Sequence, residues 1–202
     1  MLLGFQRLRR VVITVGLKAY LTDSFTPVMK SCWRHSVACA IIAERSANWS
    51  SLDKEFAYTA GILHDIGRVA LTTVMPGAYA HVIERGADQP QNLLPIEREL
   101  CGIDHCQAGR ELVTAWNLPE AFLDVTACHH SPDAHLPGTA SLIPPSCEIA
   151  DALDFAVIRC RSSRSYAEIL ADFPERVQKR FPGDAKDLAS EIANEIKVIE
   201  SV

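Results

Sequence analysis

Several features that would assign a function directly are missing from this sequence. No apolar run reaches the ~18 residues of a membrane-spanning helix, because Lys18 divides the only candidate, residues 11–21. The P-loop, the glycine-rich dinucleotide turn and the Gly-x-Ser-x-Gly elbow are also absent. Basic residues are in the minority, with 20 Lys and Arg against 25 Asp and Glu and a formal net charge of −5. We therefore expect no membrane span and no basic field that recruits nucleic acid.

The cysteines lack the pattern of a disulfide framework or of a zinc ribbon. They are seven in number, form no Cys-x-x-Cys pair and lie within apolar helical patterns such as residues 39–43. An arginine-rich segment at residues 7–10 precedes a short apolar run, but no small-residue cleavage site follows cleanly. These observations predict reduced thiols in the core of a cytoplasmic protein.

Apolar residues recur with the helical period along almost the whole chain, and no segment alternates as a strand does. With 48% hydrophobic residues, the 202-residue chain is long enough to bury a core of its own. The pattern predicts an all-α fold and a single domain over residues 1–202, with Trp33, Trp116 and Phe122 in the core. Capping residues, prolines and glycines place the expected helices at residues 2–21, 27–48, 53–66 with a loosening at Gly67, 76 onward, 95–101, 105–117, 119–130, 145–161, 166–173 and 185–199.

Several histidine and aspartate residues are candidate metal ligands. The candidates are His35, His64, Asp65, His105, His129, His130 and Asp151. Imidazole and carboxylate are ligands that Zn, Mn, Fe and Co accept. Neighbouring residues on a helix diverge by ~100°, so His64 and Asp65 suit two different metals or one bridged pair, with Asp65 as the bridge. The set is large enough for a two-metal site with open positions for water and a phosphate.

Other interpretations of the same residues stay open at this point. A helical histidine is commonly a partly exposed or hydrogen-bonded residue without a metal, and we expect His81 and His135 to lie at the surface. Two cysteine-containing sets could form a structural zinc site: Cys32, His35 and Cys39, which share a helix face, and Cys106, Cys128 and His129. Arg68 could reach a bound phosphate or be a solvated arginine near a helix C-terminus.

The segment Gly61-Ile-Leu-His-Asp-Ile-Gly-Arg68 resembles the HD superfamily of metal-dependent phosphohydrolases, and the surrounding motifs are similar to the bacterial HDOD signalling family. These motifs follow in the family's order: Trp33-Arg-His-Ser36, Glu97, Gly102-Ile-Asp-His105 with Gly109, Trp116-Asn-Leu-Pro119 and His129-His-Ser-Pro132. The resemblance covers roughly residues 30–135, and residues 136–202 form a helical C-terminal extension. The helical subdomain that normally precedes these motifs is not found, so another subunit could cover its apolar contacts.

The resemblance implies two divalent transition metal ions, of Fe, Mn, Zn, Co or Ni, held by His35, His64, Asp65, His105, His129, His130 and Asp151. It implies a regulatory output domain that binds signalling proteins or a phosphate-containing small molecule. The alternatives are an active phosphohydrolase, with Asp65 and Arg68 as catalytic residues, and a helical scaffold with an empty pocket. The Gly-Tyr-Pro signature of related cyclic di-GMP phosphodiesterases does not follow the paired histidines, which argues against that substrate.

Overall fold

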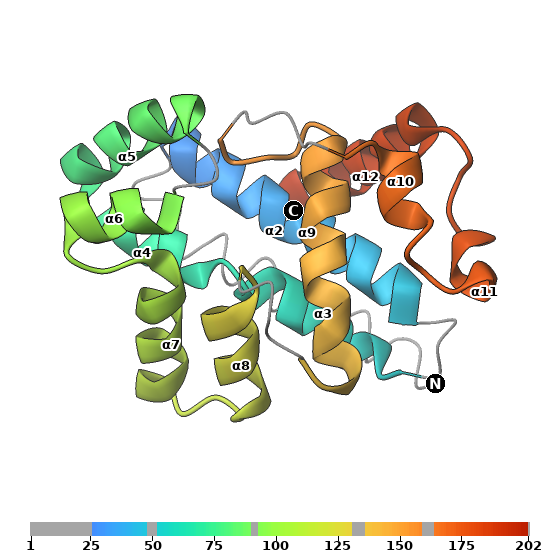
Figure 1. Ribbon diagram of the computed structural model, residues 1–202, viewed down its shortest axis with the longest axis horizontal. Coiled ribbons are helices and arrows are strands. Elements are labelled where there is room, and N and C mark those ends of the chain that lie inside the picture. Colours follow the sequence, from blue (N-terminus) through green and yellow to red (C-terminus); the bar gives the residue numbers. More distant parts are fainter. Residues whose placement is uncertain (1–25, 48–51, 90–92, 131–135, 159–163, 202) are drawn as a thin grey trace.

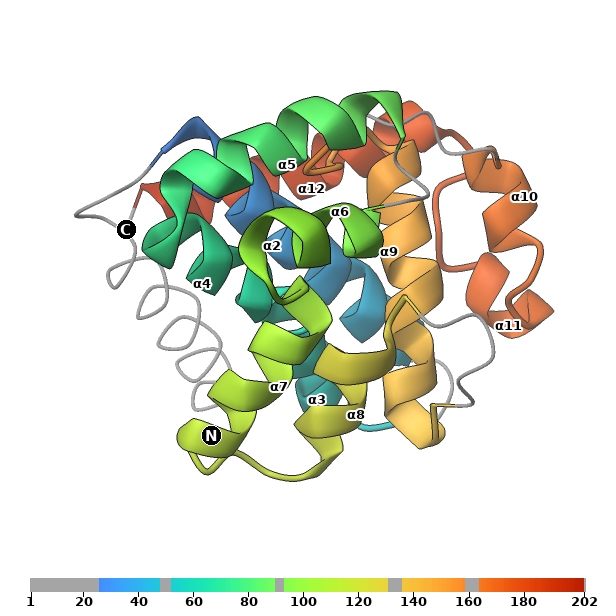
Figure 2. The same cartoon turned by 60° about the vertical axis from the view of Figure 1, so that its left-hand side comes forward.

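The computed structural model describes residues 26–47, 52–89, 93–130, 136–158 and 164–201, and within these ranges it is all-α, as predicted. Helix α2 (Pro27–Ala47) runs through the middle of the molecule in both views (Figures 1 and 2). It packs against α3 (Lys54–Leu63), α4 (Ile66–Val74), α9 (Ile143–Ala152) and α12 (Ala185–Glu200). Consistent with this central position, 14 of its 21 residues are buried. None of the described helices is long and apolar enough to cross a membrane.

The other helices surround this centre. Helix α5 (Pro76–Asp88) pairs with α6 (Leu93–Cys101), and α7 (His105–Ala115) packs on α4 and on α8 (Ala121–Cys128). A 3₁₀ helix, η3 (Gly138–Leu142), leads into α9. Two short helices, α10 (Tyr166–Leu170) and α11 (Glu175–Gln178), precede α12 (Figure 1). The helix expected at residues 2–21 lies outside the described residues.

Local capping confirms several of the predicted helix starts. Asp53 caps α3 by accepting the backbone N–H groups of Glu55 and Phe56, and Asp184 caps α12 by accepting that of Lys186. Pro76 stands in the first turn of α5, where its missing N–H costs no helical hydrogen bond. Side-chain acceptors and proline therefore fix these helix starts without long-range information.

Two predicted helix ends are wrong. The long helix expected over residues 145–161 ends at Ala152, because Asp154 adopts a left-handed conformation with φ of 64°. The N–H of Phe155 then bonds to the carbonyl of Ala150, and that of Asp154 to the carbonyl of Asp151, as in a Schellman motif. Helix α3 ends at Leu63, and the chain breaks at His64 and Asp65 before α4 begins, whereas a loosening at Gly67 was expected.

The core confirms two of the three predicted aromatic residues. Trp33 and Phe122 are buried in the main cluster, but 44% of Trp116 is exposed. Trp116 caps the C-terminus of α7, just before the chain reverses at Asn117 with φ of 52° toward α8. It therefore stands at a turn on the surface, where an apolar side chain has few partners.

Close contact between helices α2 and α3 depends on small residues. A Cβ atom added to Gly61 would lie 2.4 Å from the Cα of Ala40, closer than any real contact. Alanines on both helices, including Ala40 and Ala60, are fully buried at this contact. The close approach holds the C-terminal end of α3, with His64 directly after it, against the middle of α2, which carries His35.

Candidate metal centre

The predicted ligands converge from five separate places in the sequence, mostly at helix ends. His35 lies within α2, and His64 and Asp65 form the break between α3 and α4. His105 is the first residue of α7, His129 and His130 directly follow α8, and Asp151 is near the end of α9. His35, His64, Asp65, His105 and His129 are buried, Asp151 is half-buried and His130 is exposed. Residues up to 116 positions apart in the sequence thus meet at one place.

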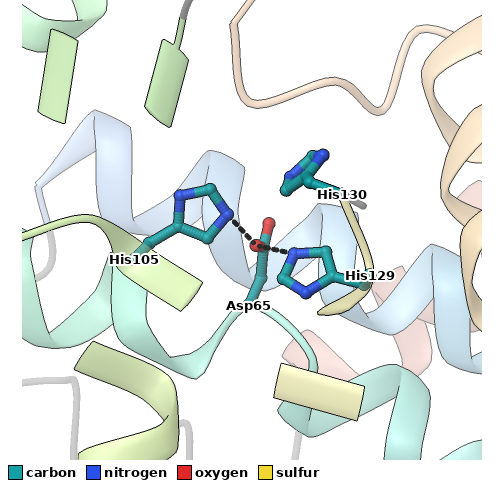
Figure 3. Close-up of side chains that lie close together, drawn as sticks. All are labelled: Asp65, His105, His129 and His130. Carbon is teal, nitrogen blue, oxygen red and sulfur yellow. Dashed lines mark hydrogen bonds and ion pairs between the residues drawn. The ribbon is translucent and has the colours of Figure 1, made fainter. Parts of the chain in front are cut away.

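Asp65 is the centre of this cluster. Its Oδ1 lies 3.3 Å from Nε2 of His105 and 3.2 Å from Nε2 of His129 (Figure 3). Its Oδ2 faces the other side, 3.7 Å from Nε2 of His64 and 3.8 Å from Nε2 of His35. The two oxygens of one carboxylate therefore face two different sets of imidazoles, the arrangement that a bridging ligand needs.

Three of the imidazoles are held in the tautomer that a metal ligand requires. The Nδ1 of His64 lies 2.8 Å from the carbonyl oxygen of Gly61, and that of His129 lies 3.1 Å from the carbonyl of Val125. The Nδ1 of His105 lies 2.6 Å from Oε2 of Glu97. Carbonyl and carboxylate oxygens only accept, so Nδ1 carries a proton and Nε2 is the nitrogen that faces the centre.

Glu97 is fixed as an acceptor by its other partners. Its Oε2 also accepts the backbone N–H of His105 at 2.9 Å, and its Oε1 accepts the Tyr79 hydroxyl at 3.0 Å. The glutamate is fully buried. The sequence motifs included Glu97 but predicted no role for it. Its role in orienting His105 depends on the contact of α6 with the start of α7.

Two of the inward-facing nitrogens lack partners among the protein groups. Nε2 of His64 and Nε2 of His105 are buried and make no hydrogen bond. Nε2 of His105 nevertheless lies 3.3 Å from Asp65 Oδ1, so a lone pair there faces another acceptor. Such an arrangement is unfavourable unless a cation lies between the groups. The donor set of neutral nitrogens and one carboxylate fits a divalent transition metal.

The electrostatics of the site favour the ligand forms of Asp65 and His105, whereas at His35 burial is outweighed by the negative charge of Asp151, which raises the pKa well above its usual value. Burial disfavours a charged Asp65, but the adjacent Arg68 guanidinium is the strongest of the opposing influences, and the pKa of Asp65 lies well below its usual value. Burial and the positive charge of Arg68 lower the pKa of His105 well below its usual value. At neutral pH the centre therefore offers an ionised carboxylate and a neutral imidazole.

Arg68 points into the centre. Its Nε lies 2.8 Å from Asp65 Oδ2, and its terminal Nη2 lies 3.3 Å from Nε2 of His130. Only 5% of the residue is exposed, and it stands in the first turn of α4. The alternative of a solvated arginine near a helix C-terminus is therefore wrong. A role in binding phosphate stays a prediction.

The potential ligands form two groups. In the first, Asp65, His105, His129 and His130 each offer an atom within 4.8 Å of the others. In the second, His35 and His64 are joined by Cys147, a residue of α9 that the sequence analysis did not select. Asp151 lies beside this second group, with Oδ1 3.2 Å from Nδ1 of His35. Cys147 stands four residues before Asp151, a helical spacing that could have drawn attention to it.

A cavity of about 130 Å³ opens onto both groups. Its polar wall includes His64, Asp65, Arg68 and Cys147, and its apolar wall includes Leu93. This volume accommodates several water molecules or a group the size of phosphate.

The two cysteine-based alternatives do not form among the described residues. Cys32, His35 and Cys39 share α2 but do not converge as a group of three ligand atoms, and neither do Cys106, Cys128 and His129. Cys32, Cys39 and Cys106 are buried free thiols, as predicted, whereas Cys101, Cys128 and Cys147 are half-buried. His81 is exposed, as expected, and His135 lies outside the described residues.

Known proteins resemble this chain at the level of family and fold. The family model for the HDOD domain matches residues 1–132. Ribonuclease Y from Lactobacillus acidophilus is 26% identical over 198 residues, which are 98% of this chain and 30% of the ribonuclease. The chain thus spans less than a third of the length of that curated relative.

Two solved structures share the fold. An HDOD domain protein from Geobacter sulfurreducens superposes with a TM-score of 0.68 at 22% identity, over 97% of this chain and 69% of the other. The MmoQ response regulator from Methylococcus capsulatus has a TM-score of 0.58 at 24% identity, over 84% of this chain and 63% of the other. At these identities the likeness establishes the arrangement of helices.

Proposed function

The chain belongs to the HDOD domain family, and from this premise we propose that it is a signalling output module that binds divalent transition metals at its HD-type centre. The observation that carries the proposal is Asp65, which turns its two carboxylate oxygens toward different sets of imidazole Nε2 atoms, those of His64 and His105 being buried without a hydrogen-bond partner. The name of the MmoQ response regulator, which shares the fold, supports a place in signalling.

We assign two metal positions that share Asp65. His105, His129 and His130 would hold one ion, and His35 and His64 the other, with Asp151 beside the second position. The bound ions would supply Lewis acidity, and their positive charge would stabilise the ligand atoms that face one another. The protein groups position the ligands: Glu97 orients His105, and backbone carbonyls orient His64 and His129.

Metal content is the direct test. Protein purified without chelators should carry metal at up to two ions per chain, and removal by a chelator should lower the thermal midpoint in a way that added Mn²⁺, Fe²⁺ or Zn²⁺ reverses. Asp65→Asn should lose both ions, and His130→Ala should weaken mainly one. His81→Ala, which removes an exposed histidine of α5, is the matched control and should bind as the wild type does. Less than one ion per chain, with no stabilisation by added metal, contradicts the proposal.

A regulatory module also needs an output. We propose that the domain contacts signalling proteins or a second copy of itself in the cytoplasm, and that it binds a small phosphate-containing ligand in the cavity beside Arg68. The acidic net charge of −5 disfavours a long nucleic acid as partner. Equilibrium binding of phosphate or of a nucleotide to metal-loaded protein tests this step, with chelated protein as the control.

A second candidate function is metal-dependent phosphohydrolysis. It is favoured by the presence of every family ligand position and by the match to a ribonuclease over 98% of the chain. Asp65 would bridge the metals, and Arg68 would hold a non-bridging phosphate oxygen. Metal-loaded wild type should then hydrolyse an aryl phosphodiester, and Arg68→Ala should lose turnover while retaining its metals. If both metal positions are filled and neither mono- nor diesters are hydrolysed, the phosphohydrolase function is rejected and the regulatory function is retained.

A further inference from the structure

We propose that the Cys147 thiolate is a ligand of the second metal position, together with His35 and His64, and that it makes this position selective for zinc-like ions. This inference rests on the proposed metal centre and adds a ligand that the family motifs do not contain. It also assigns Asp151 a positioning role, in which it holds the His35 ring.

The geometry brings the thiol to the centre. Cys147 and Asp151 stand one helical turn apart on α9, and both line the cavity. One ligand atom from each of His35, His64 and Cys147 lies within 4.8 Å of the other two.

His64 provides an independent observation. Its Nδ1 donates to the Gly61 carbonyl, and its Nε2 is buried without a hydrogen-bond partner. Its ring therefore presents an unused lone pair to the space that it shares with His35 and Cys147. A buried lone pair of this kind is stabilised by an ion, and the thiolate would be the softest donor beside it.

Asp151 does not join the group of three ligand atoms. Its Oδ1 lies 3.2 Å from Nδ1 of His35, an ion-pair distance, although this nitrogen makes no hydrogen bond. Its side chain also remains about one-third exposed to solvent, whereas that of His35 is almost fully buried. We therefore separate the positioning carboxylate, Asp151, from the thiolate ligand, Cys147.

Cys39 completes the environment of the thiol. Its Sγ lies 3.5 Å from Sγ of Cys147, and Cys39 is fully buried on α2. On binding a metal as the thiolate, Cys147 would release its proton to solvent, and the Cys39 thiol could then donate its hydrogen to the thiolate. A soft thiolate beside two imidazoles suits Zn²⁺ and Co²⁺, whereas Mn²⁺ and Mg²⁺ prefer oxygen ligands.

Cobalt substitution tests the assignment with a spectroscopic readout. Wild-type protein freed of metal and loaded with Co²⁺ should show a thiolate-to-cobalt charge-transfer band in the near ultraviolet. Cys147→Ser should lose this band, whereas Asp151→Asn should retain it. Cys101→Ser, which replaces a half-buried thiol at the end of α6, is the matched control and should keep the full band. Thermal unfolding of the metal-free variants shows that each has folded.

Affinity provides the second measurement. Cys147→Ser should weaken Zn²⁺ binding at the second position by about 100-fold or more, while Mn²⁺ binding changes by less than about tenfold. Bound Co²⁺ without a charge-transfer band in the wild type, or a band that survives Cys147→Ser, overturns the assignment of Cys147 and leaves the metal centre standing. Failure of the wild type to bind Co²⁺, Zn²⁺ or Mn²⁺ overturns both proposals.

Discussion

Gly67→Ala is expected to separate helix α4 from helix α7 and thereby damage the centre. A Cβ atom at position 67 would lie 1.9 Å from the carbonyl oxygen of His105 and 2.6 Å from the backbone nitrogen of Gly109. The first distance is about 1.5 Å shorter than ordinary van der Waals contact. Both neighbours are backbone atoms of α7, so no side-chain rotation relieves the clash. The helices must move apart by more than an ångström, which places the cost at about 3 kcal/mol or more.

The same movement would displace His105 from Asp65, because His105 is the first residue of α7 and Asp65 directly precedes α4. We therefore expect about 10- to 100-fold weaker metal binding, in addition to the loss of stability. Urea unfolding of metal-free protein measures the first effect, and calorimetric titration with Mn²⁺ or Zn²⁺ measures the second.

Gly77→Ala is the matched control for this substitution. Gly77 stands in the first turn of α5, and an added Cβ would meet nothing within 4 Å. Alanine there should stabilise the protein by about 0.4–1 kcal/mol, since it restricts the unfolded chain without a clash. If Gly67→Ala unfolds within about 0.5 kcal/mol of the wild type and binds metal equally well, the close contact between α4 and α7 is refuted.

Two further predictions concern the support of His105 and an exposed helix cap. Glu97→Gln removes the carboxylate that accepts the Nδ1 proton of His105, so titration should show metal affinity lower by about 10- to 100-fold; an unchanged affinity would contradict the orienting role. The Ser165 backbone N–H and hydroxyl lower the pKa of Glu168 in the capping box of α10. Its stabilising contribution is therefore present above its unfolded pKa and is lost as the pH falls from about 5 to about 3. Glu168→Gln should make stability less dependent on pH in that interval, and equal slopes for both proteins would exclude the effect.

The sequence by itself determined the features that depend on neighbouring residues. Side-chain caps such as Asp53 and a first-turn proline such as Pro76 act within a single helical turn, and they marked helix starts correctly. The helical spacing of the apolar residues is also a local feature of the sequence, and it predicted the all-α fold. The ordered motifs around His64 and Asp65 identified the family, which the match over residues 1–132 confirms.

Backbone conformation and contacts between distant helices decided the features that the sequence analysis missed. The end of α9 depends on the left-handed Asp154, a conformation that only a few residue types adopt and that no local motif announced. Gly67 was expected to loosen a helix, but its missing side chain instead admits the backbone of α7, whose first residue is 38 positions away.

The candidate site divides in the same way. Residue type and order selected the imidazoles and Asp65, because metal chemistry restricts which side chains can serve. The direction of each Nε2 lone pair was decided by partners from the fold, such as the Glu97 carboxylate that holds His105. The burial of Arg68 beside Asp65 and the proximity of Cys147 to His64 also depend on the packed helices. Segments that are remote in the sequence come into contact only when the core forms.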